Sequence, residues 1–444
     1  MMAQEAEIGR KASLLSILSV KYEDDRRKSS LGQKVPKDPY YVVYITCFLM
    51  GFMNVVPIFF FNAAAGYWMY KFRDPSLGSG TTSGSERTTL QAYYQPCAVV
   101  AQQLPSIIFS FILTVYGHKF SAMKRVLVTL SLFVVLYLTF AVFTQINTDS
   151  WQSGFFVMTI SLLVLNTALT ATIQMSSAVV MAKLPQNYLM SFLLGQNGSI
   201  LTSILQIIAV AVTDFQPTAG LIYFLVGSFI IAITLALLMM SRNTKLFEHY
   251  QVEVANNQHS EMISRVEAKE LLKKIWPSLV ITCILIGNMT TIHPAITTLV
   301  ESQYNNTSWS DKYFTPVCVF LTSDAASLLG RIVSNKALIT ESNKWWYVVI
   351  TLARFLVSVP ICMLFDAQPR TNIPVIFNKD WEFIIFSALF GFTMGFLMNI
   401  SFMSLKSLAP GKQEQSLKIM VLSFSLTSAI TAANGLLMVK ALLL

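Results

Sequence analysis

Asp324, Ser327 and Arg331 are the residues of this sequence whose types and spacing most directly suggest chemistry. They occupy positions i, i+3 and i+7 in the apolar stretch "FLTSDAASLLGRIVS" (320–334), so a helix would place all three on one face. A carboxylate, a hydroxyl and a guanidinium on one face can hydrogen-bond a polar solute. Seven residues rise about 10 Å along a helix, so Asp324 and Arg331 can pair fully only through Ser327, water or another helix.

The composition of the chain indicates that this helix lies in a membrane. Of 444 residues, 54% are hydrophobic and 12% are charged, and the mean hydropathy is +0.56. A charged side chain in the middle of a bilayer costs several kcal/mol and rarely faces lipid, so the polar face is expected to look into a cavity lined by protein. We favour a solute path over the alternative, which is a structural ion pair between two helix bundles.

Eleven apolar stretches predict eleven membrane-spanning helices. They lie near residues 40–68, 96–117, 124–144, 154–183, 189–212, 218–240, 275–300, 313–335, 345–365, 381–406 and 414–440. Lys and Arg concentrate in the N-terminal leader and in alternate loops, so the positive-inside rule predicts a cytoplasmic N-terminus and an extracellular C-terminus. This topology explains the net charge of +9, and a nucleic-acid partner is not expected.

The longest predicted inside loop divides the helices into six and five. We therefore expect an all-α membrane protein with a cytoplasmic basic leader (1–39), an N-terminal six-helix bundle (40–240), a cytoplasmic loop (241–274) and a C-terminal five-helix bundle (275–444). Asn305 and Asn306 begin tandem glycosylation sequons in a predicted outside loop. The leader's dileucine at Leu14 has Arg10 in place of an acid four residues earlier, so the plasma membrane is favoured over the lysosome.

The remaining polar residues indicate neither an enzyme nor a metal site. The five cysteines lie in or beside apolar runs without a CxxC pair, and the four histidines are scattered, so no cofactor or metal is expected. Amides within apolar helices, such as Gln174, need partners in lipid and either join helices or contact a neutral polar solute. Arg354 is expected to join two neighbouring helices.

Several motifs resemble those of the equilibrative nucleoside transporters, in the same order along nearly the entire chain. The matching stretches are "FMNVVPIFFFN" (52–62), "ATIQMSSAVVMAKLP" (171–185), "GQNGS" (195–199), "YFTPVCVFLTSDAASLLGR" (313–331), "LARFLVSVPICMLFDAQPRTNIPVIFNKDWEFIIF" (352–386) and "GFLMNISFM" (395–403). The resemblance implies a fold like that of the major facilitator superfamily. It also implies an alternating-access cycle and passive transport of nucleosides, and sometimes of nucleobases.

The resemblance also implies roles for individual residues. Gln174 matches the family's fourth-helix glutamine that meets the nucleobase, and Arg331 matches an eighth-helix arginine near the ribose. The family's aspartate one turn before that arginine is Ser327 here, and its asparagine a turn earlier is Asp324. We expect Asp324 to hydrogen-bond base amines beside Gln174, or to hold Arg331 through Ser327 and water. The other predicted substrate-binding residues are Val55, Asn62, Gln103, Thr170 and Phe320.

Alternative functions within and outside this family remain open at the level of sequence. One branch of the family carries organic cations and monoamines, which the extra acid Asp324 would favour and the neighbouring Arg331 would oppose. Transport of nucleobases or cations, with proton coupling through Asp324, is therefore the second hypothesis. A non-transporting membrane receptor ranks lower, because it would need no polar path over several helices, and nothing in the sequence bears on oligomeric state.

Overall fold

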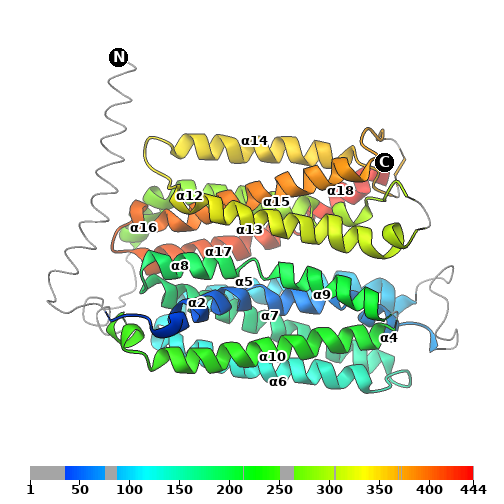
Figure 1. Ribbon diagram of the computed structural model, residues 1–444, viewed down its shortest axis with the longest axis horizontal. Helices are drawn as coiled ribbons and strands as arrows, with labels where there is room; N and C mark the ends of the chain where they lie inside the picture. The colour runs from blue at the N-terminus through cyan, green and yellow to red at the C-terminus, as the bar shows by residue number, and fades with distance from the viewer. Residues whose placement is uncertain are drawn as a thin grey trace, which may run out of the picture.

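The computed structural model describes residues 36–443, except 76–87, 214, 251–264, 305–306, 369 and 372. Most of the predicted leader, part of the predicted cytoplasmic loop and the sequon residues Asn305 and Asn306 lie outside the described residues. Within the described ranges, the regular elements are helices, and the long ones run side by side along the longest axis (Figure 1). The helix at Val42 begins at one end of that axis, and the C-terminus lies at the other.

The helices fall into an earlier and a later set along the chain. The earlier set is α2 (Val42–Met53), α3 (Val56–Ala63), α4 (Ala65–Lys71), α5 (Thr89–Tyr116), α6 (Ala122–Gln145), α7 (Gln152–Ala182), α8 (Gln186–Gly195), α9 (Ser199–Val212) and α10 (Gln216–Arg242). The later set is α12 (Arg265–Ile292), α13 (Thr322–Val333), α14 (Lys344–Met363), α15 (Asp380–Met403), α16 (Leu405–Leu408), α17 (Gln413–Thr431) and α18 (Asn434–Leu443). Short 3₁₀ turns are η1 (Pro39–Tyr41), η3 (Gly117–Lys119), η4 (Thr297–Leu299) and η7 (Ser334–Lys336), and the π-helical η5 (Trp309–Tyr313) and η6 (Thr315–Leu321) lead into α13.

Nine of the described helices are long and apolar enough to cross a membrane. A tenth candidate is the pair Pro39–Met53 and Val56–Ala63, which is bent by 47° and covers most of the predicted first span at 40–68. The predicted last span at 414–440 is formed by α17 and α18, and it is not among the nine. The described part of the chain therefore supports nine or ten of the eleven predicted spans by length and composition.

Proline and glycine explain where two of the predicted spans break. Pro57 lies in the first turn of α3, where its missing N–H is tolerated, and the chain bends just before it at Asn54 and Val55. The span at 189–212 breaks between α8 and α9 at Gln196–Gly198. A Cβ on Gly198 would lie 2.6 Å from the Phe52 ring, so only glycine fits this crossing.

Glycines also bring α13 and α15 into backbone contact. A Cβ on Gly395 would lie 2.0 Å from the carbonyl oxygen of Ser327, and one on Gly330 would lie 2.2 Å from that of Phe392. Real Cβ atoms do not approach so closely, so these positions accept glycine alone. The packing fixes α13, which carries Asp324 and Arg331, against α15.

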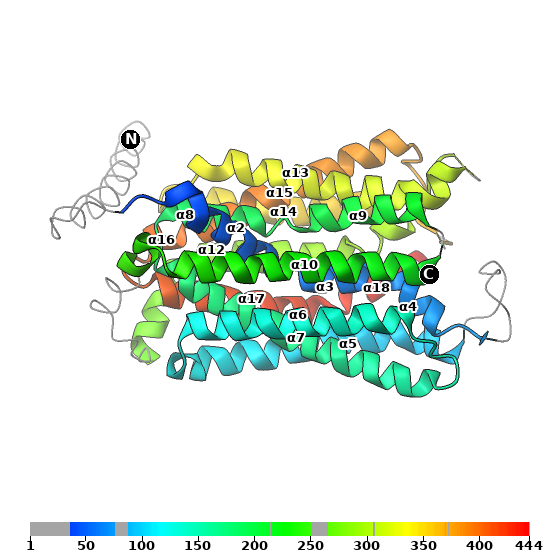
Figure 2. The ribbon, with the colours of Figure 1, turned by 60° about the horizontal axis from the view of Figure 1, so that its bottom comes forward.

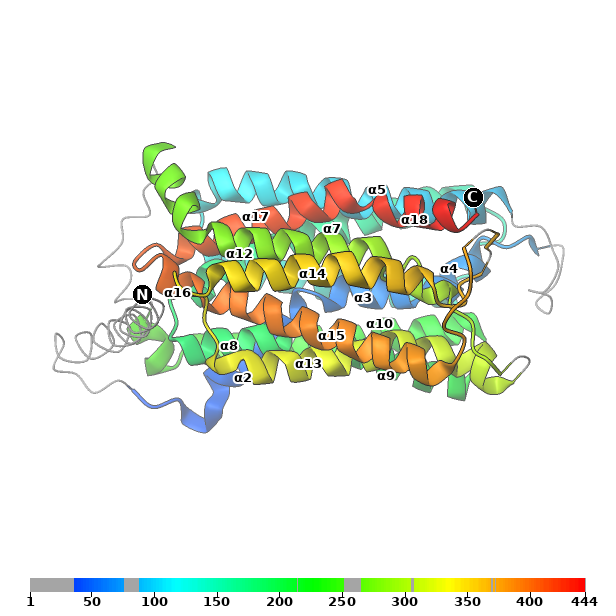
Figure 3. The same cartoon turned by 90° about the horizontal axis from the view of Figure 1, so that it is seen from above.

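The two sets of helices form two groups that lie against each other, α2–α10 and α12–α18 (Figure 1). Figures 2 and 3 show α13 of the second group beside α8 and α9 of the first. We call them the N-terminal and C-terminal groups. In the first, α2 packs on α8 and α5 on α7; in the second, α12 packs on α17 and α13 on α15, so the same pairing order recurs. The groups meet along two seams. The first seam joins α5 and α7 to α17, and the second joins α8 and α9 to α13 and η6.

Candidate substrate-binding cavity

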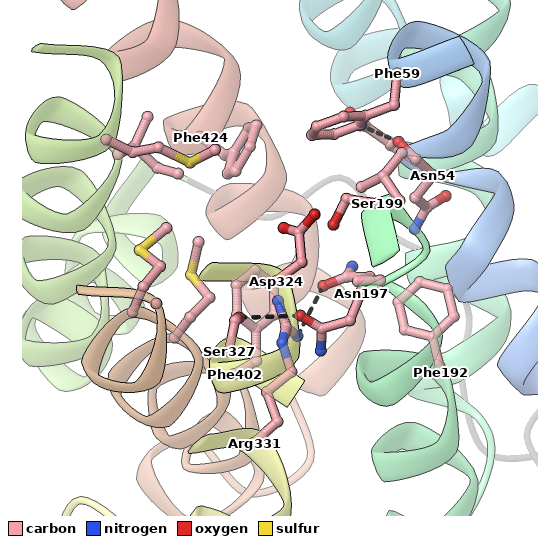
Figure 4. A pocket seen from close by; sticks show the side chains of 18 of the residues that line it. Asn54, Phe59, Phe192, Asn197, Ser199, Asp324, Ser327, Arg331, Phe402 and Phe424 are labelled. Atoms are coloured by element: carbon pink, nitrogen blue, oxygen red, sulfur yellow. Dashed lines mark hydrogen bonds between the residues drawn. The ribbon is translucent and has the colours of Figure 1, made fainter. Parts of the chain in front are cut away.

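A cavity of about 190 Å³ lies between the two groups. Its polar lining residues are Asn54, Gln174, Gln196, Asn197, Ser199, His293, Ser323, Asp324, Ser327 and Arg331. Its apolar lining includes Val55, Phe59, Phe192, Phe390, Phe402 and Phe424, together with four methionines. Figure 4 shows the α13 side chains on one side and the Asn54 and Phe59 side chains on the other. Such a lining suits a solute with an aromatic body and several hydrogen-bonding groups.

The Asp324 carboxyl group lines this cavity and forms no ion pair with a described residue. The Ser203 hydroxyl donates to Asp324 Oδ2 at 2.9 Å. The Ser199 side chain faces the same carboxylate across the cavity (Figure 4). Asp324 and Arg331 are both described, and no ion pair joins them.

Arg331 instead binds the end of a helix in the other group. It is 7% exposed, and its Nη1 donates to the Leu193 carbonyl at 2.7 Å and to Gln196 Oε1 at 3.4 Å. Leu193 lies in the last turn of α8, where carbonyls lack helical donors and the helix dipole favours a cation. The buried Nε of Arg331 makes no hydrogen bond to any described residue, so the cavity wall keeps one unused donor.

Ser327 completes a ladder of contacts across the second seam. Its hydroxyl donates to Asn197 Oδ1 at 3.0 Å. Asp324, Ser327 and Arg331 thus each bind α8, α9 or the break between them, and we call these three residues the α13 ladder. The ladder residues line the cavity and join the two groups at once.

Gln174 lies across the cavity and binds the bend of the first span. Its Nε2 donates to the Asn54 carbonyl at 2.9 Å, and Ser177 donates to Asn54 Oδ1 at 3.2 Å. The bend before Pro57 leaves that carbonyl available. Val55, at the same bend, also lines the cavity.

Five of the nine predicted substrate-binding residues therefore line one cavity: Val55, Gln174, Asp324, Ser327 and Arg331. The other four lie outside its wall. Gln103 accepts a hydrogen bond from Ser428 on the first seam, exposed Asn62 accepts one from Gln102, and buried Thr170 donates to the Asn166 carbonyl of its own helix. Phe320 packs edge-on against His293, with 5.2 Å between ring centroids. The part of each residue in binding stays a prediction.

Sequence reasoning missed Asn54 and His293 as lining residues. His293 Nδ1 lies 3.0 Å from Thr297 Oγ1 at the end of α12. The only signal in the sequence was the nearby proline, Pro57 for Asn54 and Pro294 for His293, because helix ends expose polar groups to cavities. Arg354 does join two helices as expected: its guanidinium binds Thr393 and the Phe390 carbonyl of α15.

The described residues form no metal-binding cluster. Among the described residues, no group of three or more His, Cys, Asp or Glu side chains is arranged to hold a metal ion, and the five cysteines are free. What the arrangement can do is bind a solute between two groups of helices.

Comparison with known proteins decides the family. A family model described as nucleoside transporter matches residues 158–270 and 247–432, which together exceed half of the chain. The chain belongs to the nucleoside transporter family. This is a family of transporters and not of enzymes, and with nine apolar helices in its described part this member is a multi-pass membrane protein.

Named relatives align with this nucleoside transporter family member over most of their length. Equilibrative nucleoside transporter 1 of Rattus norvegicus is 24% identical, covering 91% of this chain and 98% of its own. The Homo sapiens protein of that name is 24% identical (89% and 96%), and equilibrative nucleoside transporter 3 of Rattus norvegicus is 21% identical (88% and 87%).

A solved structure shows the fold of this family member. The proton:xylose symporter XylE of the major facilitator superfamily, bound to 6-bromo-6-deoxy-D-glucose, superposes with a TM-score of 0.58. The match covers 90% of this chain and 89% of that one at 11% sequence identity, so it bears on fold alone. The expected likeness to the major facilitator fold is confirmed.

Proposed function

We propose that this chain carries nucleosides across a membrane by facilitated diffusion. The observation that carries the proposal is the cavity between the two groups, where amide, carboxylate and guanidinium side chains face aromatic walls. A nucleoside combines a flat aromatic base with a hydroxyl-rich sugar, and this lining offers partners for both. The three relatives named above are equilibrative nucleoside transporters, which supports the same substrate class.

In this proposal the substrate competes with the partners of the α13 ladder for binding to Asp324 and Arg331. A base amine binds Asp324 beside Gln174, and sugar hydroxyls bind the free Nε of Arg331 or displace Gln196 from its Nη1. Val55 shapes the apolar part of the binding site, and Ser327 contributes a hydroxyl group. Because ladder contacts cross the second seam, substrate binding would alter how the two groups are held together, which is what an alternating-access cycle requires.

We infer eleven crossings in a six-plus-five arrangement, with α17 and α18 as the eleventh. The start of α2 and the C-terminus lie at opposite ends of the long axis, which supports an odd number of crossings (Figure 1). Charge asymmetry supports a cytoplasmic N-terminus, an extracellular C-terminus and the domain boundaries at residues 39, 240 and 274. Glycosylation at Asn305 or Asn306 would place that loop on the non-cytoplasmic side of the membrane. A mobility shift on glycosidase treatment, lost in the double Gln variant, tests this.

The decisive experiment is uptake of radiolabelled adenosine and uridine into transporter-deficient cells. Asp324→Asn and Arg331→Ala are compared with the parent and with Asp149→Asn, which removes a carboxylate paired with Arg73 far from the cavity. At equal surface expression, we expect saturable uptake by the parent and by Asp149→Asn. Both cavity variants should reduce uptake at least about tenfold, because each loses hydrogen bonds to a charged group. Absence of nucleoside uptake by the parent would instead favour a nucleobase or organic-cation substrate.

A further inference from the structure

A second cavity lies away from the α13 ladder, at one end of the first seam. It has a volume of about 160 Å³ and is lined by the turn between α5 and α6, the end of α7 and the first turns of α17. That volume corresponds to about five water molecules. Under the orientation proposed above, this end of the molecule faces the cytoplasm.

The charges that line this cavity are unbalanced. Arg125, Lys183 and Lys418 bring three cations, and Glu414 brings one carboxylate. Lys418 Nζ lies 2.5 Å from Glu414 Oε1, and these side chains are only 17% and 13% exposed, so the acid is already neutralised. A net charge of two positive remains on the wall, with the exposed His118 at the rim. An anion would compensate this charge.

Arg125 has hydrogen-bond donors that no described residue uses. Its Nε and Nη1 are buried and have no hydrogen-bond partner among the described residues. A Cβ on Gly117 would lie 2.4 Å from Arg125 Nη1, so glycine at this turn allows the guanidinium to lie against the backbone. Buried donors without acceptors are rare in folded proteins, and among the described arginines only Arg125 has two such nitrogens.

We propose that this cavity binds a phosphate group that joins the two groups of helices. A phosphate monoester carries a charge of about −1.5 to −2 at neutral pH, which matches the net charge of the wall, and its oxygens accept from arginine and lysine. Arg125 and Lys183 belong to the N-terminal group, whereas Lys418 belongs to the C-terminal group. A phosphate bound to all three holds the first seam closed at this end. The phosphate comes either from a lipid headgroup or from a soluble anion.

The binding step is tested on the full-length purified protein without any nucleoside. In nanodiscs of phosphatidylcholine, we expect inorganic phosphate to raise the melting temperature by about 2 °C over potassium chloride of equal ionic strength. Arg125→Gln and Lys183→Gln abolish this rise. Lys124→Gln keeps it, because Lys124 is exposed and does not line the cavity. Gly117→Ala reduces it by displacing the guanidinium while leaving every charge in place.

A second arm distinguishes the two sources of phosphate. Nanodiscs that also contain phosphatidylinositol 4-phosphate are compared with those of phosphatidylcholine alone, with no phosphate in solution. A rise with the lipid only assigns the site to a headgroup, and a rise with inorganic phosphate assigns it to a soluble anion; either supports the proposal. No rise with either probe, or an equal rise in Arg125→Gln and the parent, overturns it.

The consequence for transport rests on the proposed function and is measured separately. Proteoliposomes loaded with phosphate should exchange uridine about threefold more slowly than those loaded with chloride, because bound protein is withdrawn from the cycle. Arg125→Gln should remove the difference. The melting experiment needs no substrate. It can therefore contradict the phosphate site without contradicting nucleoside transport, and the uptake experiment can contradict nucleoside transport without contradicting the phosphate site.

Discussion

At the scale of single residues, the central feature is the Asp324 carboxyl group, whose described hydrogen-bond donor is the Ser203 hydroxyl. The Ser203 proton has two acceptors in reach, Asp324 Oδ2 at 2.9 Å and the Ser199 carbonyl at 3.1 Å. The carboxylate is the stronger acceptor. We expect Ser203→Ala to lower the free energy of unfolding by about 1.5–3 kcal/mol, because it removes a buried bond to a charged group.

The melting temperature of the solubilised protein measures this effect. Ser161→Ala is the matched control, because the exposed Ser161 hydroxyl bonds only to the Val157 carbonyl of its own helix. The double change Ser203→Ala with Asp324→Asn should lower the free energy of unfolding by less than the sum of the two single effects. Both changes remove the same hydrogen bond. Strict additivity would show that Ser203 does not support the carboxylate.

Residue type and spacing predicted part of the cavity and could not predict the rest. Asp324, Ser327 and Arg331 were predictable as cavity residues because charged groups in an apolar helix must face protein. Their partners were not, since Ser203 and the Leu193 carbonyl belong to another group of helices and carry no local signal. Asn54 was missed because a single amide in an apolar run is as consistent with a contact between helices as with a position in a cavity wall.

At the scale of elements, the close packing of α13 on α15 sets the position of the ladder. A Cβ on Gly395 would meet the Ser327 carbonyl at 2.0 Å, whereas one on Gly287 would meet only Thr431 Cγ2 at an ordinary 3.5 Å. We expect Gly395→Ala to force the helices apart at a cost of about 1–3 kcal/mol and to abolish uptake, and Gly287→Ala to be tolerated. Surface expression, melting temperature and uridine uptake measure both. Equal behaviour of the two variants would contradict the argument.

The sequence predicted which segments form helices, but it did not predict where those helices are interrupted. Long apolar runs must be helical in lipid, because every backbone polar group needs an internal partner. The same rule allows a break wherever neighbouring helices or a cavity satisfy the freed groups. The predicted spans at 40–68, 189–212 and 414–440 are therefore each divided, and the freed Asn54 carbonyl is bound by Gln174.

At the scale of the whole molecule, charge and hydropathy predicted a division into two bundles, but they could not predict the seams between them. Positive charge in alternate loops indicated a topology, and the long inside loop indicated a division after the sixth span. Which helices meet across the division depends on side-chain fit between segments hundreds of residues apart. Ser110 and Ser425, whose hydroxyl oxygens lie 3.1 Å apart on α5 and α17, are an example.

The same pair tests whether the groups move against each other during transport. Replacing Ser110 and Ser425 by cysteine places two thiols within reach of a disulfide across the first seam. If the groups must separate there, oxidation stops uridine uptake and dithiothreitol restores it. The control replaces Thr46 and Ser241, whose hydroxyl oxygens lie 2.7 Å apart on α2 and α10 within the N-terminal group. A cross-link inside one group should leave uptake intact. Uptake that survives a complete Ser110–Ser425 cross-link would mean that this seam stays closed throughout the cycle, and the second seam alone would then have to open.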